Sequence, residues 1–230
     1  MFKNLFSKTP VPDWLQPYFD AKSSMPSKDT PLQNLRFVVL DTETTGLNIK
    51  KDNLLSIGAI IIENQEIIIN QSLELIVFND TKVENEAILI HGILPTDSKE
   101  GKQAKIALEE FINFLGNSVI VAHHTGFDRA MLTKAIRVLY PSFNFYNNDL
   151  DTAKMAMKID NISTDRQIVD RQKYTLDALC ERYDIEVVER HTAWGDAFTT
   201  ALLFLKLAAI LEERGVNKLK DFSPRRICLF

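Results

Sequence analysis

Two carboxylates separated by one residue follow the first strongly apolar segment of the chain. Asp41 and Glu43 flank Thr42 at the end of the run 36–41, whose length and composition predict a strand buried on both faces. Because side chains alternate along a strand with a period of two, both carboxylates should point to the same side. A turn predicted at residues 44–46 places them at the carboxyl end of the strand, where α/β sheets commonly bind ligands. The same spacing at Asp184 and Glu186 follows a predicted helix end and indicates a solvated loop.

A third acid, Asp128, lies at the start of the helical pattern over residues 127–139. It shares one stripe with Leu132, Ala135 and Leu139, and this stripe should face the protein interior. A buried carboxylate needs a compensating partner. The alternative is an N-terminal capping role, in which helix amides satisfy the side chain.

A histidine and a fourth acid, His191 and Asp196, are five positions apart. On one helix these positions are about 140° apart, so the side chains converge only if His191 precedes the helix and Asp196 lies in its first turns. Thr192, as the N-terminal cap of a helix predicted over residues 193–211, permits that arrangement. Taken alone, His191 would be interpreted as a surface loop histidine.

Four acids in one cleft would repel one another and lose hydration unless cations lie between them. Oxygen-only ligation favours Mg²⁺ or Mn²⁺, and two divalent ions would balance the four negative charges. That balance is typical of two-metal phosphoryl transfer. His191 would then be a base that titrates near neutral pH and takes a proton from the attacking water.

The remaining periodicities predict the elements that must position these groups. Strands are expected over residues 36–41, 54–63, 66–77 and 118–122. Asn64 and Gln65 should join the second and third strands as an antiparallel hairpin. Helical patterns cover residues 102–115, 127–139, 151–157, 175–183 and 193–211, and the polar stretch 160–173 is expected to be a mobile loop. This order predicts an α/β fold, a mixed central sheet flanked by helices.

Proline content divides the chain into an extension and a folded domain. Five of the eight prolines lie in the first 31 residues, which predicts an N-terminal extension over residues 1–34, a domain over 35–213 and a short tail over 214–230. The extension contains a short apolar helical face formed by Trp14, Leu15, Tyr18 and Phe19. This face is expected to dock on its own domain or to bind a partner protein.

Composition narrows the class of protein. The 230 residues are 45% apolar and 25% charged, which is ordinary globular composition. No apolar run approaches the roughly 18 residues of a membrane span, and the first residues lack a signal-peptide apolar core, so a cytoplasmic protein is expected. Cys180 and Cys228 form neither a disulfide framework nor a zinc pattern. The net charge of −4 argues against a basic phosphate-binding domain and leaves residues such as Lys50, Lys51 and Arg190 as scattered phosphate contacts.

Three blocks of sequence carry a resemblance to a known family. They begin at Asp41 (Asp-Thr-Glu-Thr-Thr-Gly), His123 (His-His-Thr-Gly-Phe-Asp) and His191 (His-Thr-Ala-Trp-Gly-Asp). In this order and spacing they resemble the three motifs of the DEDDh 3′–5′ exonucleases, and most closely those of the epsilon proofreading subunits of bacterial DNA polymerase III. Each motif alone is weak, whereas the conjunction of all three is specific.

The resemblance implies an RNase H-like fold, with an exonuclease domain over residues 35–213. It also implies a site for two divalent cations, Mg²⁺ or Mn²⁺, held by Asp41, Glu43, Asp128 and Asp196, with His191 as the general base. By the same matching, Glu86 and His91 would contact the terminal nucleotide, and its pocket would be lined by Thr44, Thr45 and Leu47. Outside the family match, Glu86 and His91 are interpreted as a solvated acid and part of a helix cap.

The implied activity is hydrolysis at the 3′ end of single-stranded DNA, with release of nucleoside 5′-monophosphates. The alternative is an RNase T-like exonuclease that acts on RNA or short oligoribonucleotides with the same motifs. A non-catalytic binding module fits less well because all five catalytic residues are present, and a nucleotidyl-transfer enzyme fits less well because the eight glycines do not cluster. A polymerase or other protein partner is expected through the N-terminal extension.

Overall fold

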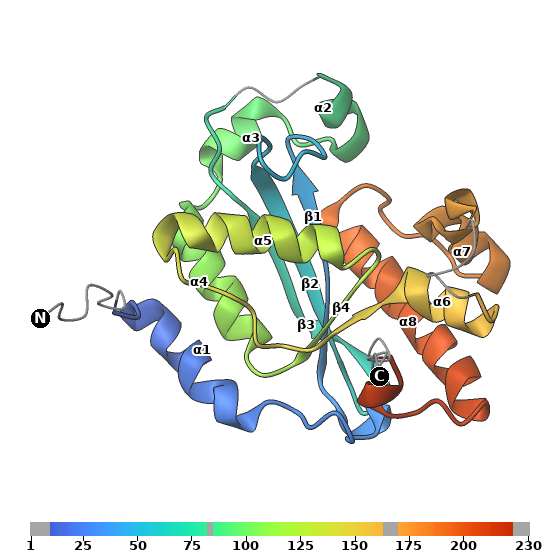
Figure 1. Cartoon of the computed structure of the whole chain (residues 1–230). Helices are drawn as coiled ribbons and strands as arrows, with labels where there is room; N and C mark the ends of the chain where they lie inside the picture. Colours follow the sequence, from blue (N-terminus) through green and yellow to red (C-terminus); the bar gives the residue numbers. More distant parts are fainter. Residues whose placement is uncertain (1–9, 82–84, 163–169, 223–230) are drawn as a thin grey trace, which may run out of the picture.

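The computed structural model of the chain describes residues 10–81, 85–162 and 170–222, without the side chains of residues 85 and 86. Its strands form one mixed sheet in the order β3-β2-β1-β4-β5 (Figure 1). They are β1 (Phe37–Thr44), β2 (Leu54–Glu63), β3 (Glu66–Ile76), β4 (Val119–Ala122) and β5 (Asp149–Asp151). The pairs β1/β2 and β2/β3 are antiparallel, whereas β1/β4 and β4/β5 are parallel. The predicted α/β class with a mixed central sheet is confirmed.

Helices cover both faces of this sheet. The longer ones are α4 (Ala104–Leu115), α5 (Gly126–Leu139), α6 (Thr152–Ile159), α7 (Leu176–Tyr183) and α8 (Ala193–Glu213). The shorter ones are α1 (Gln16–Asp20), α2 (Asn85–His91) and α3 (Pro95–Glu100). Single 3-10 turns occur at Asp13–Leu15, Ala21–Ser24, Leu32–Asn34, Arg171–Tyr174 and Leu219–Phe222.

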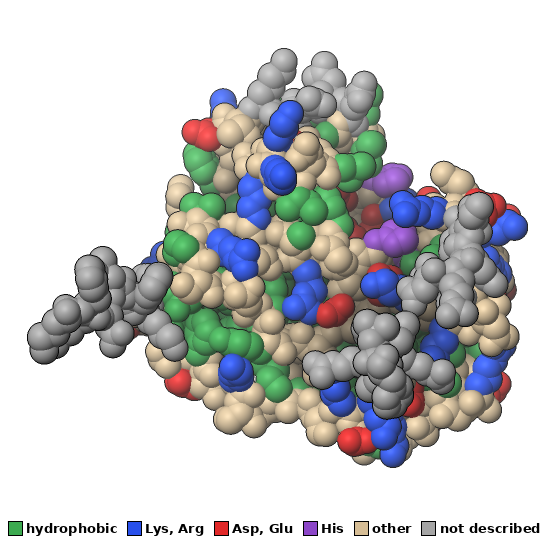
Figure 2. Space-filling model, viewed as in Figure 1, with side chains coloured by type: hydrophobic (Ala, Val, Ile, Leu, Met, Phe, Trp, Pro, Cys, Tyr) green, Lys and Arg blue, Asp and Glu red, His purple; other side chains and the backbone are tan. Residues whose placement is uncertain are grey.

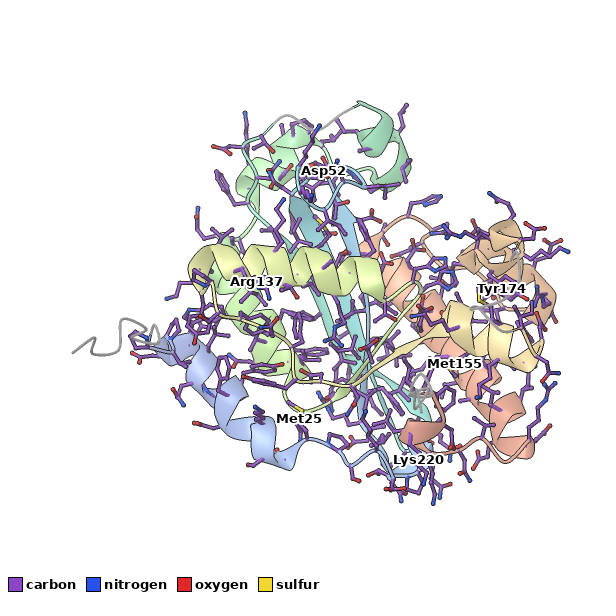
Figure 3. All side chains as sticks on the ribbon, viewed as in Figure 1. Met25, Asp52, Arg137, Met155, Tyr174 and Lys220 are labelled. Carbon is purple, nitrogen blue, oxygen red and sulfur yellow. The ribbon has the colours of Figure 1, made fainter. Side chains whose placement is uncertain are left out.

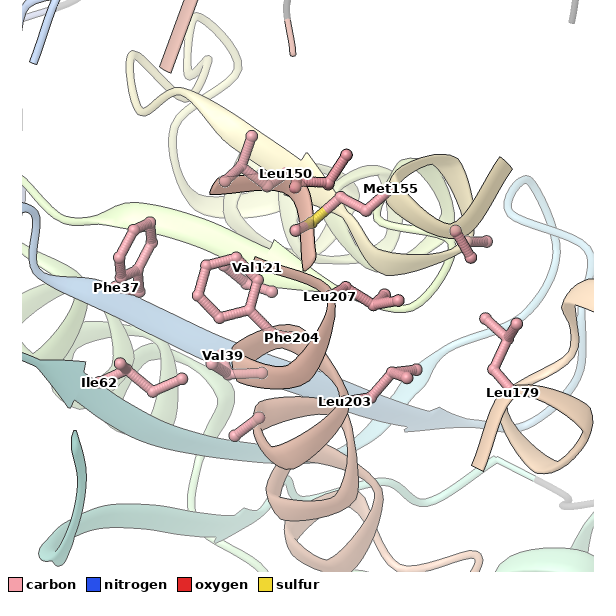
Figure 4. Close-up of a cluster of buried hydrophobic side chains, with 14 of the residues drawn as sticks. Phe37, Val39, Ile62, Val121, Leu150, Met155, Leu179, Leu203, Phe204 and Leu207 are labelled. Atoms are coloured by element: carbon pink, nitrogen blue, oxygen red, sulfur yellow. The ribbon is translucent and has the colours of Figure 1, made fainter. Parts of the chain in front are cut away.

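Alternation along β1 divides the core into two layers. Phe37 and Val39 face α6, α7 and α8, and the ring of Phe37 packs against that of Phe204 with centroids 4.8 Å apart (Figure 4). Val38 and Leu40 face the opposite side, where α4 and α5 pack. By the same alternation, the acids that follow in β1 lie on the side of Phe37 and Val39, toward α8.

The hairpin of β2 and β3 has the predicted two-residue turn. Asn64 and Gln65 have φ values of 52° and 64°. A turn with positive φ at both central residues matches the right-handed twist of the two strands that it joins. The other edge of β2 pairs with β1, so β2 supplies the residues that lie opposite the acids.

The apolar face of the N-terminal extension docks on its own domain. Leu15 and Tyr18 are buried and join the core on the side of α4 and α5. The Tyr18 hydroxyl donates to Oδ1 of Asn147 at 2.7 Å and accepts from the Tyr146 amide at 2.9 Å. Of the two alternatives for this face, docking on the domain is the one that the structure contains.

Among the described residues, α8 alone is long and apolar enough, by length and composition, to cross a membrane. It packs across the sheet instead, with Ala201, Phe204 and Leu207 buried against β1 and β2. Its apolar composition is thus used in the core of the domain.

The structure corrects three sequence predictions. β1 continues to Thr44 because β2 pairs with it through Leu54, so the first two acids lie within the strand and not beyond its end. β5 was not predicted because Leu150 is its one apolar residue, and it forms through pairing with β4. α3 was also missed. Of the expected loop 160–173, residues 163–169 lie outside the described chain, and Arg171–Tyr174 form a 3-10 turn.

Candidate active site

Asp41 and Glu43 are placed side by side by the pairing of β1 with β2. Their cross-strand partners are Gly58 and Ser56, two of the smallest residues. Directly opposed residues of antiparallel strands project from the same face, so neither partner fills the space beside the carboxylates. Both acids therefore project from one face of the sheet, as predicted, and the strand register leaves space around them.

The missing side chain of Gly58 lets α8 approach the strand that carries the acids. A Cβ atom at this position would overlap the carbonyl group of Ala193, the first residue of the helix. Asp196, in the first turn of α8, thereby reaches the two acids of β1. One carboxylate oxygen from each of Asp41, Glu43 and Asp196 lies within 4.8 Å of the other two.

The pKa values of these acids reflect like charges crowded together with little hydration. Burial raises the pKa of Glu43 to about 8, and the charge of Asp196 adds to the shift. Burial also raises the pKa of Asp41 well above its usual range, with Asp128 and Glu43 raising it further. The pKa of Asp196 is raised by burial, although Arg190 opposes the shift. Carboxylates that resist ionising together are stabilised by a cation between them.

Asp128 lies beside this set of three but is not part of it. It is in the first turn of α5 and 4% exposed, so its predicted inward orientation is confirmed. The hydroxyl of Thr42 donates to Oδ1 of Asp128 at 2.8 Å. Burial raises the pKa of Asp128 to about 7, against the effect of this hydrogen bond. Sequence reasoning missed the role of Thr42, which it treated as the spacer between two acids.

His191 precedes α8, as its spacing to Asp196 predicts. Thr192 caps the helix: its hydroxyl accepts from the Gly195 amide at 3.0 Å and donates to the Glu189 carbonyl at 2.9 Å. The His191 ring is exposed, and its backbone has a φ of 66°. A Cβ atom at Gly195 would overlap the carbonyl oxygen of Glu189, so this glycine lets the histidine loop pack onto the helix.

Arg190 has a place in the site that the sequence did not indicate. It donates through Nη1 to Oδ2 of Asp196, and through Nε to Oδ1 of Asp177 at 2.6 Å. Burial alone would lower the pKa of the guanidinium, but the hydrogen bond to Asp177 and the charge of Asp196 raise it. The guanidinium of Arg190, which was expected among the scattered phosphate contacts, is bound to two carboxylates. Lys50 and Lys51 are exposed on the loop after β1.

His123, which opens the second sequence block, ties three segments together. Its Nε2 lies 3.0 Å from the carbonyl oxygen of Tyr174, which only accepts, so this nitrogen carries the proton (Figure 3 labels Tyr174). Its Nδ1 then accepts from the Thr152 hydroxyl at 2.8 Å. Burial lowers the pKa of His123 to about 4, so the ring is neutral near pH 7.

The donor set fits a hard divalent cation. All of its donors are carboxylate oxygens, the ligand type that Mg²⁺ and Mn²⁺ prefer. Oδ1 of Asp196 is buried and has no hydrogen-bond partner among the described residues. Buried polar atoms normally have a partner. A bound cation would supply the missing partner of this oxygen.

The loop after β1 carries three of the residues expected around the terminal nucleotide. Thr44 and Thr45 are buried, and their hydroxyls donate to the Gly46 carbonyl at 2.7 Å and to Oδ1 of Asp52 at 3.2 Å. Asp52 lies at the upper end of the sheet in Figure 3 and also accepts from the Asn48 amide at 2.7 Å. These bonds fix a loop on which Leu47 is 85% exposed.

The other two expected contacts lie on α2. His91, its last residue, is 6% exposed; its Nδ1 accepts from the Ile93 amide at 3.1 Å. Its Nε2 has no hydrogen-bond partner within the described part of the chain, and burial lowers the pKa of the ring. Gly92 follows with a φ of 70°, which is the predicted helix cap. Glu86 is in the first turn of α2, and its side chain lies outside the description.

These groups reach the surface together. Figure 2 shows histidine, acidic and basic side chains gathered in a hollow between the region around α2 and α3 and the region around α7. The rings of His124 and His191 are exposed. The acids are therefore buried in part but open to a ligand from one side.

Carboxylates that meet on a mixed sheet beside a loop histidine are compatible with metal-dependent cleavage of a phosphodiester. A family model described as an exonuclease matches residues 38–204, and the chain belongs to this exonuclease (RNase T) family. The family resemblance of the three sequence blocks is thereby confirmed, and with it the RNase H-like exonuclease fold.

The chain is similar to proteins named DNA polymerase III, or a subunit of it, and to a solved exonuclease structure. It is 32% identical over 197 residues to the DNA polymerase III subunit epsilon of Buchnera aphidicola, covering 80% of this chain and 78% of that protein. It is 29% identical over 197 residues to the PolC-type DNA polymerase III of Thermotoga petrophila, covering 86% of this chain and 14% of that much longer protein. A crystal structure of E. coli exonuclease I in complex with a dT13 oligonucleotide has the same fold, with a TM-score of 0.64 at 17% identity, covering 79% of this chain and 42% of that one.

Proposed function

We propose that this chain is a metal-dependent 3′–5′ exonuclease that releases nucleoside 5′-monophosphates from the ends of single-stranded DNA. One observation carries the proposal: carboxylate oxygens of Asp41, Glu43 and Asp196 lie within 4.8 Å of one another, and Asp196, in the first turn of α8, follows the loop of His191 by five positions. A site of this kind supports phosphodiester hydrolysis because it combines a place for cations with a base for water.

Each acid has a role in this proposal. Asp41, Glu43 and Asp196 would hold Mg²⁺ or Mn²⁺, and Asp128 beside them would complete a four-carboxylate site for two ions. When bound, the ions would supply positive charge to the phosphate in the transition state. Thr42 keeps Asp128 in place through its hydroxyl. His191, exposed at the start of α8, takes the proton of the attacking water.

The terminal nucleotide would bind between the loop after β1 and the end of α2. Leu47, which is almost fully exposed on a hydrogen-bonded loop, offers an apolar surface to a base. Nε2 of His91 is buried and has no hydrogen-bond partner among the described residues, and a polar group of the bound nucleotide would supply one. Thr44 and Thr45 would line the pocket as part of the loop, and the family resemblance assigns a further contact to Glu86, a residue of the first turn of α2.

DNA is the proposed substrate class. The similar proteins are named DNA polymerase III subunit epsilon and PolC-type DNA polymerase III, and the similar structure holds dT13. An RNase T-like activity on RNA or short oligoribonucleotides remains the second proposal, because the same acids and histidine serve either polymer.

A polymerase is the proposed protein partner, on the strength of the epsilon-type relative. In the described part of the extension, Leu15 and Tyr18 are already buried against the domain, so a partner would contact its other side. The proposed division of the chain is an extension over residues 1–34, an exonuclease domain over 35–213 and a tail over 214–230. A cytoplasmic location agrees with the free, buried thiol of Cys180.

Digestion of single-stranded DNA and RNA of the same sequence by the purified protein tests the proposal. With Mg²⁺ or Mn²⁺, a 5′-labelled DNA strand should shorten stepwise from its 3′ end and release 5′-monophosphates, and EDTA should stop the reaction. Faster digestion of the RNA would favour the second proposal. Digestion that starts at the 5′ end, or that continues in EDTA, would contradict both.

A further inference from the structure

Arg190 connects two carboxylates. One is Asp177 in α7, a helix that holds none of the three acids, and the other is Asp196, which is one of them. Its Nε and Nη2 donate to the two oxygens of Asp177 at 2.6 and 3.2 Å, and its Nη1 donates to Oδ2 of Asp196. The side chain of Asp177 is 62% exposed, whereas that of Asp196 is 8% exposed. The guanidinium therefore connects the protein surface with the buried site.

The two oxygens of Asp196 have different surroundings. Oδ2 accepts the hydrogen bond of Arg190, whereas Oδ1 is buried and lacks a partner among the described residues. Rotation of the carboxylate would break the charge-assisted bond to Arg190, so this bond holds both oxygens in place. Asp196 is also one of the three acids whose oxygens meet within 4.8 Å.

We propose that Arg190 is a positioning residue, which fixes the carboxylate of Asp196 so that Oδ1 is available to a divalent cation, and that Asp177 fixes Arg190 in turn. This inference rests on the metal site of the proposed function and goes beyond it by adding two residues that do not touch the cation. Hydrogen bonds of this kind orient metal ligands, and their loss typically costs about 10–100-fold in metal affinity.

The opposite role for Arg190 is a positive charge that competes with the cation for Asp196. Removing a competitor would strengthen metal binding, whereas removing a positioning residue would weaken it. Lysine separates the two effects, because it keeps the positive charge but lacks the planar fork that reaches two carboxylates. Metal affinity in a short series of variants thus decides between the roles.

The experiment measures Mn²⁺ binding to the full-length protein, freed of metal, by following free Mn²⁺ in electron paramagnetic resonance titrations. We expect Arg190→Gln and Arg190→Lys each to weaken binding about 10–100-fold. Asp177→Asn should weaken it less, because the bond from Arg190 to Asp196 remains. Arg182→Gln is the matched control, since the side chain of Arg182 is about as exposed as that of Arg190 and forms an ion pair with Asp160, at 2.9 Å, outside the set of acids. Its Mn²⁺ affinity should equal that of the wild type.

Wild-type or tighter Mn²⁺ binding by Arg190→Gln would overturn the inference, and so would full affinity in Arg190→Lys. A loss of affinity shared by Arg182→Gln would also overturn it, because the effect would then be a general one on the fold; thermal unfolding of each variant checks this. Wild-type binding that Asp196→Asn abolishes shows that the cation site exists. If the wild type binds no Mn²⁺, the proposed function fails, and the inference fails with it.

Discussion

Asp41 lies directly opposite Gly58 in the antiparallel pairing of β1 and β2. The glycine faces the backbone of Ala193, where α8 begins, and the aspartate meets Asp196 in the first turn of that helix. No side chain separates the strand pair from the helix at this point. The distance between the acids of β1 and the acid of α8 therefore depends on the contact between two backbones.

Gly58→Ala should move α8 away from the sheet. The new Cβ atom would overlap the Ala193 carbonyl, and overpacking of this kind costs about 1–3 kcal/mol of unfolding free energy. A displacement of about 1 Å in a catalytic arrangement reduces the rate about 100-fold. We expect lower stability in denaturant unfolding, weaker Mn²⁺ binding and a kcat reduced by about that factor.

Gly126→Ala is the matched control for this variant. The position of its missing Cβ, at the start of α5, has no atom within 4 Å. Alanine also favours a helix over glycine, so stability and Mn²⁺ affinity should be unchanged or slightly higher. Equal results for Gly58→Ala and Gly126→Ala would show that the close approach of α8 does not determine the geometry of the site.

Asp41→Asn should abolish activity and yet stabilise the metal-free protein. The variant loses a cation ligand, so exonuclease activity should fall by several orders of magnitude. In EDTA, however, Asp41 must either take up a proton on folding or keep its charge among carboxylates that repel it, and asparagine removes this cost. The Tm in EDTA should exceed that of the wild type, and Mn²⁺ should raise the Tm of the wild type more than that of the variant. A lower Tm for Asp41→Asn in EDTA would mean that the ionised carboxylate is satisfied without metal.

Local patterns were sufficient to place the acids and the histidine on their elements. β1 and α8 are long apolar segments, so their positions follow from periodicity, and counting along them locates Asp41 and Asp196. The position of His191 before the helix follows from the angle between residues of one helix. Each of these arguments uses residues that are close together in the chain.

The contacts that complete the site join residues that are far apart in the chain or loop residues without a pattern. Thr42 bonds Asp128 across 86 positions, and the bond depends on how α5 packs against β1. Gly58 lies opposite Asp41 because of the register between β1 and β2. The sequence of the loop that joins these strands does not predict that register. Nothing in the local sequence distinguishes Arg190 from other surface charges, because its bond to Asp177 depends on how the loop before α8 packs against α7.

Without metal, the protein should lose stability as the pH rises toward 8. Burial raises the pKa of Glu43 to about 8 and that of Asp128 to about 7, whereas such carboxyls titrate near pH 4 in an unfolded chain. Between these values the folded protein holds protons that the unfolded chain releases. The contribution of these two carboxyls to the stability of the fold is therefore fully present below about pH 4 and is lost as the pH rises through about 7 and 8. Thermal unfolding in EDTA at about pH 5, 6.5 and 8 measures the fall.

Two controls accompany the pH series. Glu43→Gln should show a smaller fall of Tm in EDTA, because one of the titrating groups is gone. Saturating Mn²⁺ should oppose the fall, since the ion binds ionised carboxylates and so binds more tightly at higher pH. A wild-type Tm in EDTA that stays constant or rises from about pH 5 to 8 would contradict the proton uptake on folding.

His191→Asn should lose most of the turnover and keep the metal. Asparagine tolerates the positive φ of this position and cannot take a proton from water as a general base. His124→Asn is the matched comparison, because His124 is also exposed and has a φ of 62°. We expect a large fall in kcat for His191→Asn alone, with Mn²⁺ affinity near the wild-type value in both. Loss of Mn²⁺ binding in His191→Asn would instead make the histidine a ligand.

A strand without a free 3′ end should resist the enzyme. In the proposed pocket, Leu47 on the loop after β1 and His91 at the end of α2 contact the terminal nucleotide from two segments. A pocket of this kind admits the free end of a strand, and binding requires such an end. A linear single-stranded DNA should therefore be degraded while the same strand ligated into a circle stays intact, and a 3′ phosphate should slow the linear strand. Linear and circular strands with different labels, digested in one tube and separated on a denaturing gel, give the comparison with its own control. Cleavage of the circle at the rate of the linear strand would show an endonuclease and refute the pocket.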